Sequence, residues 1–423
     1  MQRSRRILAF AAVVSALFVP VVAQATNGYF ADGYGAKAEG LSGVGIAWAQ
    51  DSLAAATNPA GTANVGDRVD LGVDWFVPRR EAQIVGNAFG PDGNYDGNGR
   101  SNFFIPDIGY THQFSSALGA GVALFGNGGM NTQYDTNPYQ RFGASGAGGV
   151  NLQQLFVEPS VAWKPAPGQS LGLGLNIAYQ QFSAQGIGVF GGFSNAPGNV
   201  SDRGWDSSLG AGLRLGWSGE LLPGLTAGAT WASKIHGRFS DYRGLFADDG
   251  SFDVPENFGV GVSYLLAQDW KAGLDVQRID YGGVPAVGDP IAPLLQGVPL
   301  GAPNGPGFGW QSITVVKLGV AWQIGPAFSV RAGYSHSTQA VPSGQTFFNI
   351  LAPGIVQDNF SLGATWSVSR AQEASAFVGY APNKTVDGTA SIPPGFPPAG
   401  MGGGEANISL KETILGVSYA WKL

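Results

Sequence analysis

The sequence predicts an all-β fold: a transmembrane antiparallel β-barrel of about 14 strands with an N-terminal hatch in its lumen. Three observations lead to this prediction. The composition is poor in charge (12%) and rich in glycine (67 of 423 residues) and in aromatic residues (12%). Large apolar side chains recur with a period of two, and short connections alternate with long ones.

The composition excludes several other classes of protein. A soluble domain carries about 25% charged residues, roughly twice the fraction found here. The aromatic content argues against disorder, and the glycines do not follow a collagen-like repeat. After the N-terminal segment, no apolar run reaches the roughly 20 residues that a membrane helix needs. The chain has no cysteine, which excludes disulfides and thiolate metal sites.

Residues 1–25 are predicted to be a signal peptide. Three arginines precede an apolar stretch (residues 7–22), and Ala23-Gln24-Ala25 has the small-x-small pattern of a cleavage site. Cleavage after Ala25 would remove those arginines and change the formal net charge from −6 to −9. An acidic mature chain is a poor partner for nucleic acid. An uncleaved anchor is the alternative, although Pro20 interrupts the run. We expect the outer membrane of a Gram-negative bacterium.

Residues 68–423 show the alternation that is typical of barrel strands. Every second residue is large and apolar in segments 171–179, 209–217, 360–366 and 415–423, and the residues between are mostly small or polar. Successive side chains of a strand point to opposite faces, so each segment has one bulky apolar face. A bulky face toward lipid and a small face toward a lumen fit a barrel, and only a closed barrel satisfies the backbone of a sheet within hydrocarbon.

The connections support a strand count of about 14, because six short and seven long connections join that number of strands. The short ones lie near residues 115–117, 165–170, 218–223, 267–269, 324–326 and 369–373, and the long ones near 85–102, 127–149, 186–203, 240–251, 282–309, 339–356 and 384–407. An aromatic residue stands before each short turn and near the C-terminus, as expected for an interfacial girdle: Phe114, Trp163, Trp217, Tyr264, Trp322, Trp366 and Trp421.

Residues 26–67 do not alternate and are predicted to form a hatch inside the barrel. Asp51 can cap a short helix that ends near Asn58, because the residue before a proline disfavours the helical region. The segment is too apolar and too poorly charged to be a disordered leader, which is the alternative. Residues 26–67 are attached to the periplasmic end of the first strand, so we expect this compact apolar segment to fold back into the lumen.

The mature chain resembles the FadL/TodX-type outer-membrane transporters of hydrophobic compounds. Three segments carry the resemblance: Thr26-Asn27-Gly28-Tyr29-Phe30, Asn58-Pro59-Ala60 and Phe125-Gly126-Asn127-Gly128-Gly129-Met130-Asn131-Thr132. The resemblance implies a 14-stranded barrel closed by a hatch, with Asn58-Pro59-Ala60 in the hatch. It also implies a kink in strand three that opens the wall sideways, which we place at Gly126–Gly129 and Met130. The chain departs from the family in ending at Leu423 rather than at Phe or Trp.

The function expected from these features is passive uptake of hydrophobic molecules. Removing apolar surface from water contributes about 25 cal/mol per Å², so exposed apolar loops can capture such a ligand. The candidate capture residues, which could instead simply pack against one another, are Ile291, Leu294, Leu295, Phe347, Phe348 and Ile350. Candidate lumenal cations for a ligand carboxylate are Arg214, Lys234, Lys317 and Arg331. Mutual pairing with inward-facing Asp70, Asp74, Asp107 and Asp275 is the competing role.

Other functions find little support in the sequence. Ser335-His336-Ser337 resembles part of a hydrolase site, but neighbours on a strand face opposite sides and no acidic partner is evident, so we expect no enzyme and no cofactor. The segment 92–97 resembles half of a calcium loop, but its twelfth position is Phe103 rather than Glu, which favours an Asx-rich turn. The expected partners are a hydrophobic small molecule, outer-membrane lipid and lipopolysaccharide, with the protein a monomer. A non-specific porin or an adhesive barrel is the alternative, and fatty acid and aromatic hydrocarbon are not distinguished.

Overall fold

The computed structural model describes residues 26–395, 397 and 400–423, so the predicted signal peptide lies outside the described residues. In this part of the chain the sheet has 17 strands, of which 14 form a closed antiparallel barrel. Pairing of the last strand with the first closes the ring. The barrel strands are β3 (Arg68–Val85), β5 (Phe103–Gln113), β6 (Leu118–Tyr134), β7 (Gly148–Ala166), β8 (Gln169–Gln185), β9 (Asp206–Leu222), β10 (Leu225–Ala232), β11 (Asn257–Ala267), β12 (Trp270–Ile279), β13 (Ile313–Ile324), β14 (Phe328–Ser337), β15 (Asp358–Ser369), β16 (Gln372–Val386) and β17 (Glu405–Lys422).

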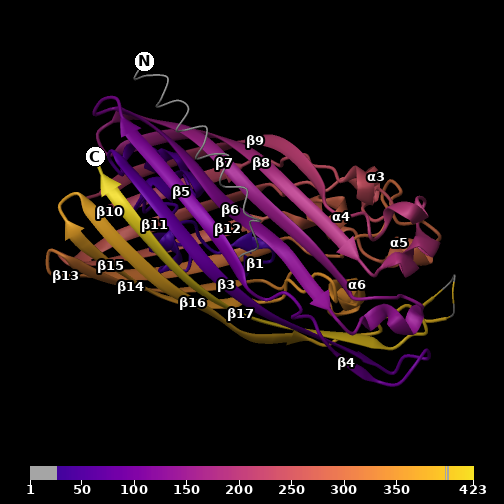
Figure 1. Ribbon diagram of the computed structural model, residues 1–423. Helices are drawn as coiled ribbons and strands as arrows, with labels where there is room; N and C mark the ends of the chain where they lie inside the picture. Colours follow the sequence, from indigo (N-terminus) through magenta and orange to yellow (C-terminus); the bar gives the residue numbers. More distant parts are fainter. Residues whose placement is uncertain (1–25, 396, 398–399) are drawn as a thin grey trace, which may run out of the picture.

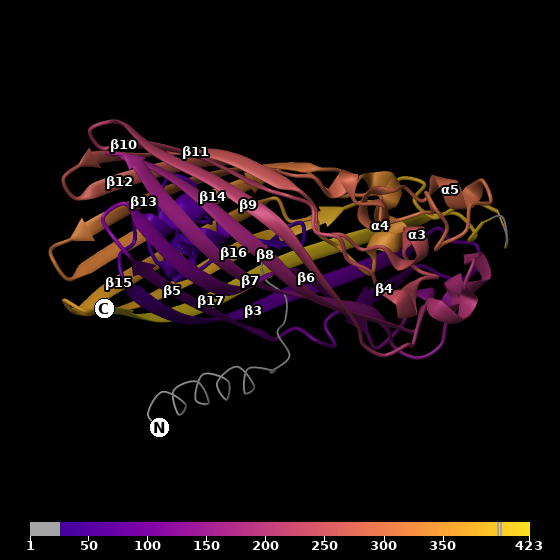
Figure 2. The ribbon, with the colours of Figure 1, turned by 90° about the horizontal axis from the view of Figure 1, so that it is seen from above.

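Short turns and long loops occupy opposite ends of the barrel, as the sequence predicts (Figures 1 and 2). The C-terminus lies at the end with the short turns, which we call the turn end; the other is the loop end. The loops carry a short strand and several helices: β4 (Gly93–Asp96), η3 (Pro138–Phe142), η4 (Gly188–Phe193), η5 (Pro197–Asn199), η6 (Ser240–Tyr242), α3 (Ala247–Gly250), η7 (Tyr281–Gly283), α4 (Pro285–Gly288), α5 (Ala292–Leu295), η8 (Ser343–Gln345) and α6 (Thr346–Asn349). No helix among the described residues has the length and apolarity needed to cross a membrane.

The large apolar residues of the strands face outward. On β8, Leu171, Leu173 and Leu175 are each at least 40% exposed, whereas Ser170 and Asn176 are buried on the lumenal face. Of the predicted girdle, Phe114, Trp163, Tyr264, Trp322, Trp366 and Trp421 are exposed and Trp217 is half-buried. An apolar band around a closed barrel is the surface that a bilayer requires.

Two loop boundaries differ from those expected. The third barrel strand, β6, continues to Tyr134 rather than ending near residue 127, because residues 128–134 stay paired with β7. The β10–β11 connection is longer than expected, because β10 ends at Ala232.

Residues 26–67, the hatch, lie inside the ring of strands (Figure 1, indigo). The hatch contains β1 (Thr26–Asn27), β2 (Phe30–Ala31), α2 (Ala36–Glu39), η1 (Ser52–Ala56) and η2 (Pro59–Ala63). The short helix expected after Asp51 is a 3₁₀ helix, with the Asp51 side chain accepting a hydrogen bond from the Leu53 amide at 3.1 Å.

Candidate functional site

Hydrogen bonds join the hatch to strands around the lumen. Asp275 of β12 accepts the amides of Gly45 and Ile46 at 2.8 and 3.0 Å. On β15, the Ser361 hydroxyl accepts the Ser42 amide at 2.7 Å. These groups are buried, so each bond satisfies a polar group that would otherwise be costly to bury. The hatch is therefore held by the wall at defined positions.

The predicted Asn58-Pro59-Ala60 segment lies close against two wall strands. Asn58 caps η2, accepting the Ala60 amide at 3.1 Å, and its side-chain nitrogen donates to the Trp217 carbonyl of β9 at 2.9 Å. A Cβ on Gly172 would collide with the Ala60 nitrogen, and a Cβ on Gly216 would collide with the Asn58 side-chain oxygen. Glycine on the lumenal face of β8 and β9 is thus required for this close approach.

The other predicted segment, residues 26–30, is bound at the middle of the wall. The Thr26 amide donates to Glu412 of β17 at 3.1 Å. The Tyr281 hydroxyl donates to the Asn27 carbonyl at 2.6 Å and accepts the amides of Tyr29 and Phe30, each at 3.1 Å. Tyr281 belongs to a long loop, so one side chain from the loop end fixes the start of the hatch.

Phe30 also pairs with Gly128 of β6, and the Tyr29 carbonyl accepts the Gly129 amide at 3.0 Å. A Cβ on Gly128 would collide with that carbonyl oxygen. The register of β6 against β7 shifts between Gly126 and Gly128, which leaves Asn127 as a bulge. The strand-three segment singled out in the sequence is therefore where hatch and wall share a hydrogen-bonded ladder.

The ladder between β5 and β6 is incomplete. Among the described residues these strands pair only from Ile108–Leu124 down to Gln113–Gly119. Toward the loop end, residues 103–107 of β5 pair with β3, and β6 pairs with β7. A Cβ on Gly126 would lie 2.8 Å from a methyl of Ile105, so this side chain fills the part of the gap beside Gly126. Beside it, a cavity of about 40 Å³ is lined by residues including Gly28, Phe103 and Met130.

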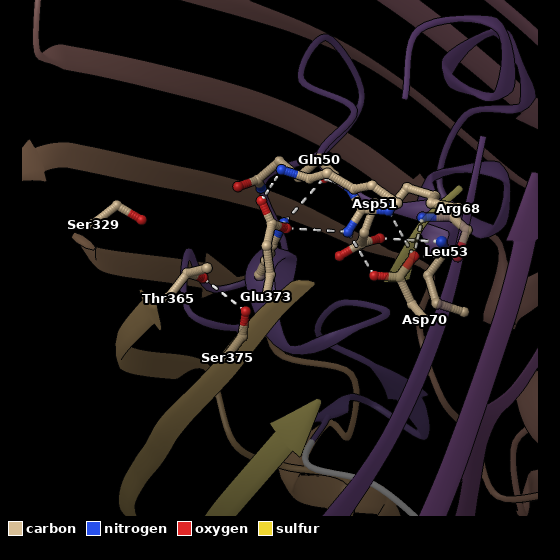
Figure 3. Close-up of polar contacts among 12 residues, drawn as sticks. Gln50, Asp51, Leu53, Arg68, Asp70, Ser329, Thr365, Glu373 and Ser375 are labelled. Carbon is tan, nitrogen blue, oxygen red and sulfur yellow. Dashed lines mark hydrogen bonds and ion pairs between the residues drawn. The ribbon is translucent and has the colours of Figure 1, made fainter. Parts of the chain in front are cut away.

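Buried charges fasten the hatch at the turn end (Figure 3). We call Lys37, Arg68, Asp70, Glu373 and Lys422 the anchor cluster. Lys37 of the hatch pairs with Glu373 at 2.6 Å, and Lys422 also pairs with Glu373. Arg68 bonds both oxygens of Asp70, at 2.7 and 2.8 Å, and reaches Glu373 at 3.3 Å.

The hatch places its own polar groups within the anchor cluster (Figure 3). Asp70 accepts both the amide and the hydroxyl of Ser52, at 3.0 and 2.5 Å. The Gln50 carbonyl accepts from Arg68 at 3.3 Å. Burial, followed by the nearby Asp70, raises the pKa of Asp51 to about 6. Burial lowers the pKa of Lys37, with Arg68 the next cause.

The candidate lumenal cations all have partners. Arg214 pairs with Glu158 at 3.3 Å, and Lys317 donates to the Asp32 carbonyl of the hatch at 2.6 Å. Arg331 donates to Thr365 and, at 3.3 Å, to Gln50 of the hatch. These three are buried. Lys234 lies beyond the end of β10 and donates to the Gly283 carbonyl at 2.6 Å, so loops rather than strand alternation set its position.

The candidate capture residues lie in a cap formed by the loops, and most of them pack against one another. Phe347 and Ile350 are buried, as is Ile291. Phe347 contacts the rings of Tyr139 and Phe142, with centroids 5.5 and 5.6 Å apart. Leu294 and Phe348 are partly buried, and Leu295 is 50% exposed.

A small cavity of about 30 Å³ lies within this cap. Its lining is apolar and comes from several loops, and it includes Phe190, Phe246, Phe308, Phe348 and Leu351. The aromatic residues of loops that are far apart in the sequence therefore converge around one apolar space.

The structure differs from two expectations for the minor motifs: residues 93–96 form a strand, and His336 has an acidic partner, Asp358. The Gly93–Asp96 segment is the strand β4, paired with β3, rather than a turn. No group of three His, Asp or Glu side chains suited to a metal occurs in the described ranges. Ser335 donates to Asp32 in the lumen, whereas His336 is half exposed and bonds Asp358 at 2.8 Å.

Several contacts at the site have no counterpart in the sequence-based expectations. Tyr281 and Glu373 are single residues whose partners lie 252 and 336 positions away in the chain. No local pattern marks them. The close approach at Gly172 and Gly216 could have been expected from the sequence, because both glycines lie on the lumenal face of strands predicted from alternation.

The family model and the similar solved structures point to the same group of proteins. The family model described as "Outer membrane protein transport protein (OMPP1/FadL/TodX)" matches residues 21–391. A Pseudomonas aeruginosa FadL homologue has a similar structure, with a TM-score of 0.70, 15% identity, and coverage of 93% of this chain and 99% of that one. The P. putida toluene transporter TodX has a TM-score of 0.64 and 15% identity, and the match covers 93% of this chain and 99% of that one. The Ralstonia pickettii toluene transporter TbuX gives the same four values. No curated protein matches the sequence.

Proposed function

Because the chain belongs to the OMPP1/FadL/TodX family of outer membrane transport proteins, we propose that it is a passive channel for hydrophobic molecules. The proposed ligands are long-chain fatty acids or aromatic hydrocarbons. Two of the similar structures are toluene transporters, which supports the second class. The ligand enters at the loop end, passes the hatch, and leaves sideways through the wall between β5 and β6.

The incomplete β5–β6 ladder is the observation that carries this proposal. Within hydrocarbon, each unsatisfied backbone group costs several kcal/mol, so a wall normally keeps its ladder complete. Here the hatch supplies part of the missing ladder through Phe30 and Tyr29. A gap that a separate segment fills can open when that segment moves, while the strands on both sides stay paired with β3 and β7.

Capture begins in the loop cap. Burying apolar ligand surface contributes about 25 cal/mol per Å², and the apolar cavity beside Phe348 provides such a surface. Phe347 and Ile350 shape the cap from within, because they are buried in it. Leu295, half exposed at the tip of α5, is the candidate for first contact.

A ligand carboxylate would meet a lumenal cation only after the hatch moves. Lys317 and Arg331 donate to Asp32 and Gln50 of the hatch, so docking of the hatch occupies both cations. Displacement would expose them to the lumen. Arg214 is paired with Glu158 of the wall and stays neutralised.

The proposal includes the expected setting of the protein. Residues 1–25 direct the chain to the outer membrane and are cleaved after Ala25. The turn end faces the periplasm, the loop end faces outward, and the monomer is embedded in outer-membrane lipid and lipopolysaccharide. No cofactor or energy source is required, because the ligand moves down its own gradient into the bilayer.

A reversible lock across the gap tests the sideways exit. The chain has no cysteine, so Ile105→Cys with Gly126→Cys introduces a single disulfide between β5 and β6. We expect toluene or oleate uptake into proteoliposomes to stop when this variant is oxidised and to return on reduction. The matched control is Val73→Cys with Val417→Cys, which crosses the paired β3–β17 junction.

The control variant should transport equally in both redox states. Equal uptake by the oxidised gap variant would refute the sideways exit. Large, steady ion conductance without hydrocarbon binding would instead favour the porin alternative.

A further inference from the structure

The outward face of β6, β7 and β8 changes chemistry partway along the strands. On β8 the outward residues are apolar up to Tyr179 and continue as Gln181, Ser183 and Gln185. On β7 the change occurs between Leu155 and Gln153. It falls at one level, since Gln153 pairs with both Gly129 and Gln181.

Six polar side chains lie above this level, and we call them the amide patch: Asn131, Asn151, Gln153, Gln181, Ser183 and Gln185. Residues 131, 151 and 183 are direct neighbours across the three strands. Four residues separate the Gln181 and Gln185 rows, so at about 3.3 Å per residue the polar band is roughly 13 Å long, measured along the strand. The patch thus begins where the apolar band ends and faces away from the lumen.

A second long stretch of wall, formed by β16, β17 and β3, also extends toward the loop end, but its outward face carries the charged residues Arg79, Glu81 and Lys411. By contrast, β13 presents Leu318 and Val316 outward and ends at Ile313, one residue beyond Thr314. β10 has only 8 residues, whereas β7 has 19. The long strands β6–β8 therefore raise their side of the wall above the apolar band, and this side carries uncharged polar residues, mostly amides.

Four residues of the amide patch line a groove of about 290 Å³: Asn131, Asn151, Ser183 and Gln185. Two loops form its sides, one with Arg100 and the other with Asp202 and Trp205. Trp205 is 47% exposed. The side-chain oxygen of Asn131, a residue only 7% exposed, has no hydrogen-bond partner among the described residues. Leaving a buried acceptor without a partner is unfavourable, and a ligand that donates a hydrogen bond to it would remove that cost.

The chemistry of this groove suits a sugar. Amide side chains both donate and accept, as sugar hydroxyls do, and an exposed indole offers a flat apolar face to a pyranose ring. Arg100 and Asp202 carry opposite charges, so the lining does not select for an anion. The groove is too polar for the hydrophobic ligand of the transport path.

We propose that the groove binds the saccharide part of an outer-leaflet glycolipid, with the acyl chains of that lipid lying against the apolar band below. This inference rests on the proposed membrane orientation, in which the loop end faces outward. A wall that rises above the hydrocarbon on one side meets the sugar layer of the outer leaflet there. The glycolipid would then sit beside the bulge at Asn127, next to the proposed exit.

Binding of a lipid-free sugar tests the proposal most directly. The probe is the core oligosaccharide released from lipopolysaccharide by mild acid, titrated calorimetrically into the full-length mature protein in detergent. We expect saturable binding that weakens at least tenfold in Asn151→Leu with Gln185→Leu. The matched control is Thr385→Leu with Ser409→Leu, which replaces two exposed outward hydroxyls on β16 and β17.

The control should bind the oligosaccharide as the wild type does. Absence of saturable binding, or equal affinity in the patch variant, would overturn the proposal, as would equal retention of lipid A and of complete lipopolysaccharide by the wild type. Toluene uptake is measured on the same preparations. If toluene uptake persists while sugar binding fails, this inference is wrong and the proposed function stands. If sugar binding persists while toluene uptake fails, the transport path alone is refuted.

Discussion

The β17–β3 junction and the β5–β6 junction both join neighbouring strands of one barrel, but they are closed in different ways. The first, the seam, pairs every residue from Glu405–Val85 to Lys422–Arg68 without a register shift. The second ends its ladder at Ile108–Leu124, and hatch residues occupy part of the space beyond.

The difference bears on the proposed sideways exit, which needs a junction that can open while the barrel stays closed. The seam joins the two ends of the sheet, so opening it would expose two complete strand edges to lipid. The gap lies between strands that remain paired on their other sides with β3 and β7. A movable segment can therefore close the gap, whereas only a continuous ladder can close the seam.

The largest effect is expected from Gly128→Val at the gap. The new side chain would collide with the Tyr29 carbonyl and separate β2 from β6. We expect the N-terminal hatch strand to lose its docked position while the barrel still folds. Planar-bilayer recordings should show raised conductance, and heat-modifiable gel migration should be unchanged.

Gly126→Ala on the same strand is the control for that variant. Its Cβ would meet only a methyl of Ile105, which can rotate away. Conductance should stay at the wild-type level. Identical recordings for Gly128→Val and Gly126→Ala would show that the hatch does not depend on close approach at residue 128.

Arg68→Met at the turn end of the seam should have the next largest effect. Asp70 would lose its bidentate partner while remaining buried, and removing one partner of a buried ion pair costs about 3–5 kcal/mol. The same change at Lys422, whose side chain is 43% exposed, should cost about 0–1 kcal/mol. A urea titration, with hydrogen exchange of residues 51–53 as the readout, measures the loss of stability in each variant. Equal losses would contradict the assigned role of burial.

Tyr281→Phe should weaken the gap closure by a smaller amount. Its hydroxyl donates to the Asn27 carbonyl and accepts from the amides of Tyr29 and Phe30. Leaving these buried groups unpaired costs about 1–3 kcal/mol. Hydrogen exchange at residues 27–30 should accelerate, while exchange along β17 should not. Acceleration at both places would mean that the variant loosens the whole barrel.

The smallest effect is expected from pH. Because burial raises the pKa of Asp51 to about 6 from an ordinary value near 3.8, the folded hatch prefers the protonated acid. The stability that this preference contributes is present below about pH 4 and is lost as the pH rises through about 6. After correction for intrinsic rates, hatch exchange should be faster at pH 8 than at pH 5, and Asp51→Asn should reduce the difference. A slower rate at pH 8 would reverse the assigned sign.

The strands were predictable because their pattern is local. The alternation in residues 171–179 records which side chains meet lipid, and it needs no knowledge of the partner strand. The cap at Asp51 was also local, since its side chain binds an amide two residues ahead. Asn58 was expected only as the end of a helix, whereas it caps the next helix, η2. The family resemblance implied a kink at residues 126–129, and a register shift lies between Gly126 and Gly128.

The remaining features depend on contacts between distant parts of the chain. Nothing near Phe30 indicates that it pairs with Gly128, and nothing near Lys37 indicates Glu373. Lys234 was assigned by extending an alternation past the point where its strand ends. The amide patch did leave a trace, since a glutamine follows the last large apolar outward residue in both strands, Leu155 on β7 and Tyr179 on β8. These two changes fall at one register level, which is visible only after the strands are aligned.

One contact at the start of the hatch gives the removal of the leader a chemical consequence. The Thr26 nitrogen and hydroxyl both donate to Glu412, and the two residues are buried deep in the wall. Cutting the preceding peptide bond, as proposed, would convert that nitrogen from a neutral amide into an α-ammonium. Cleavage of the leader would then create a positive charge at the Thr26 nitrogen beside the Glu412 carboxylate. The resulting ion pair would hold Thr26 at this position in the barrel.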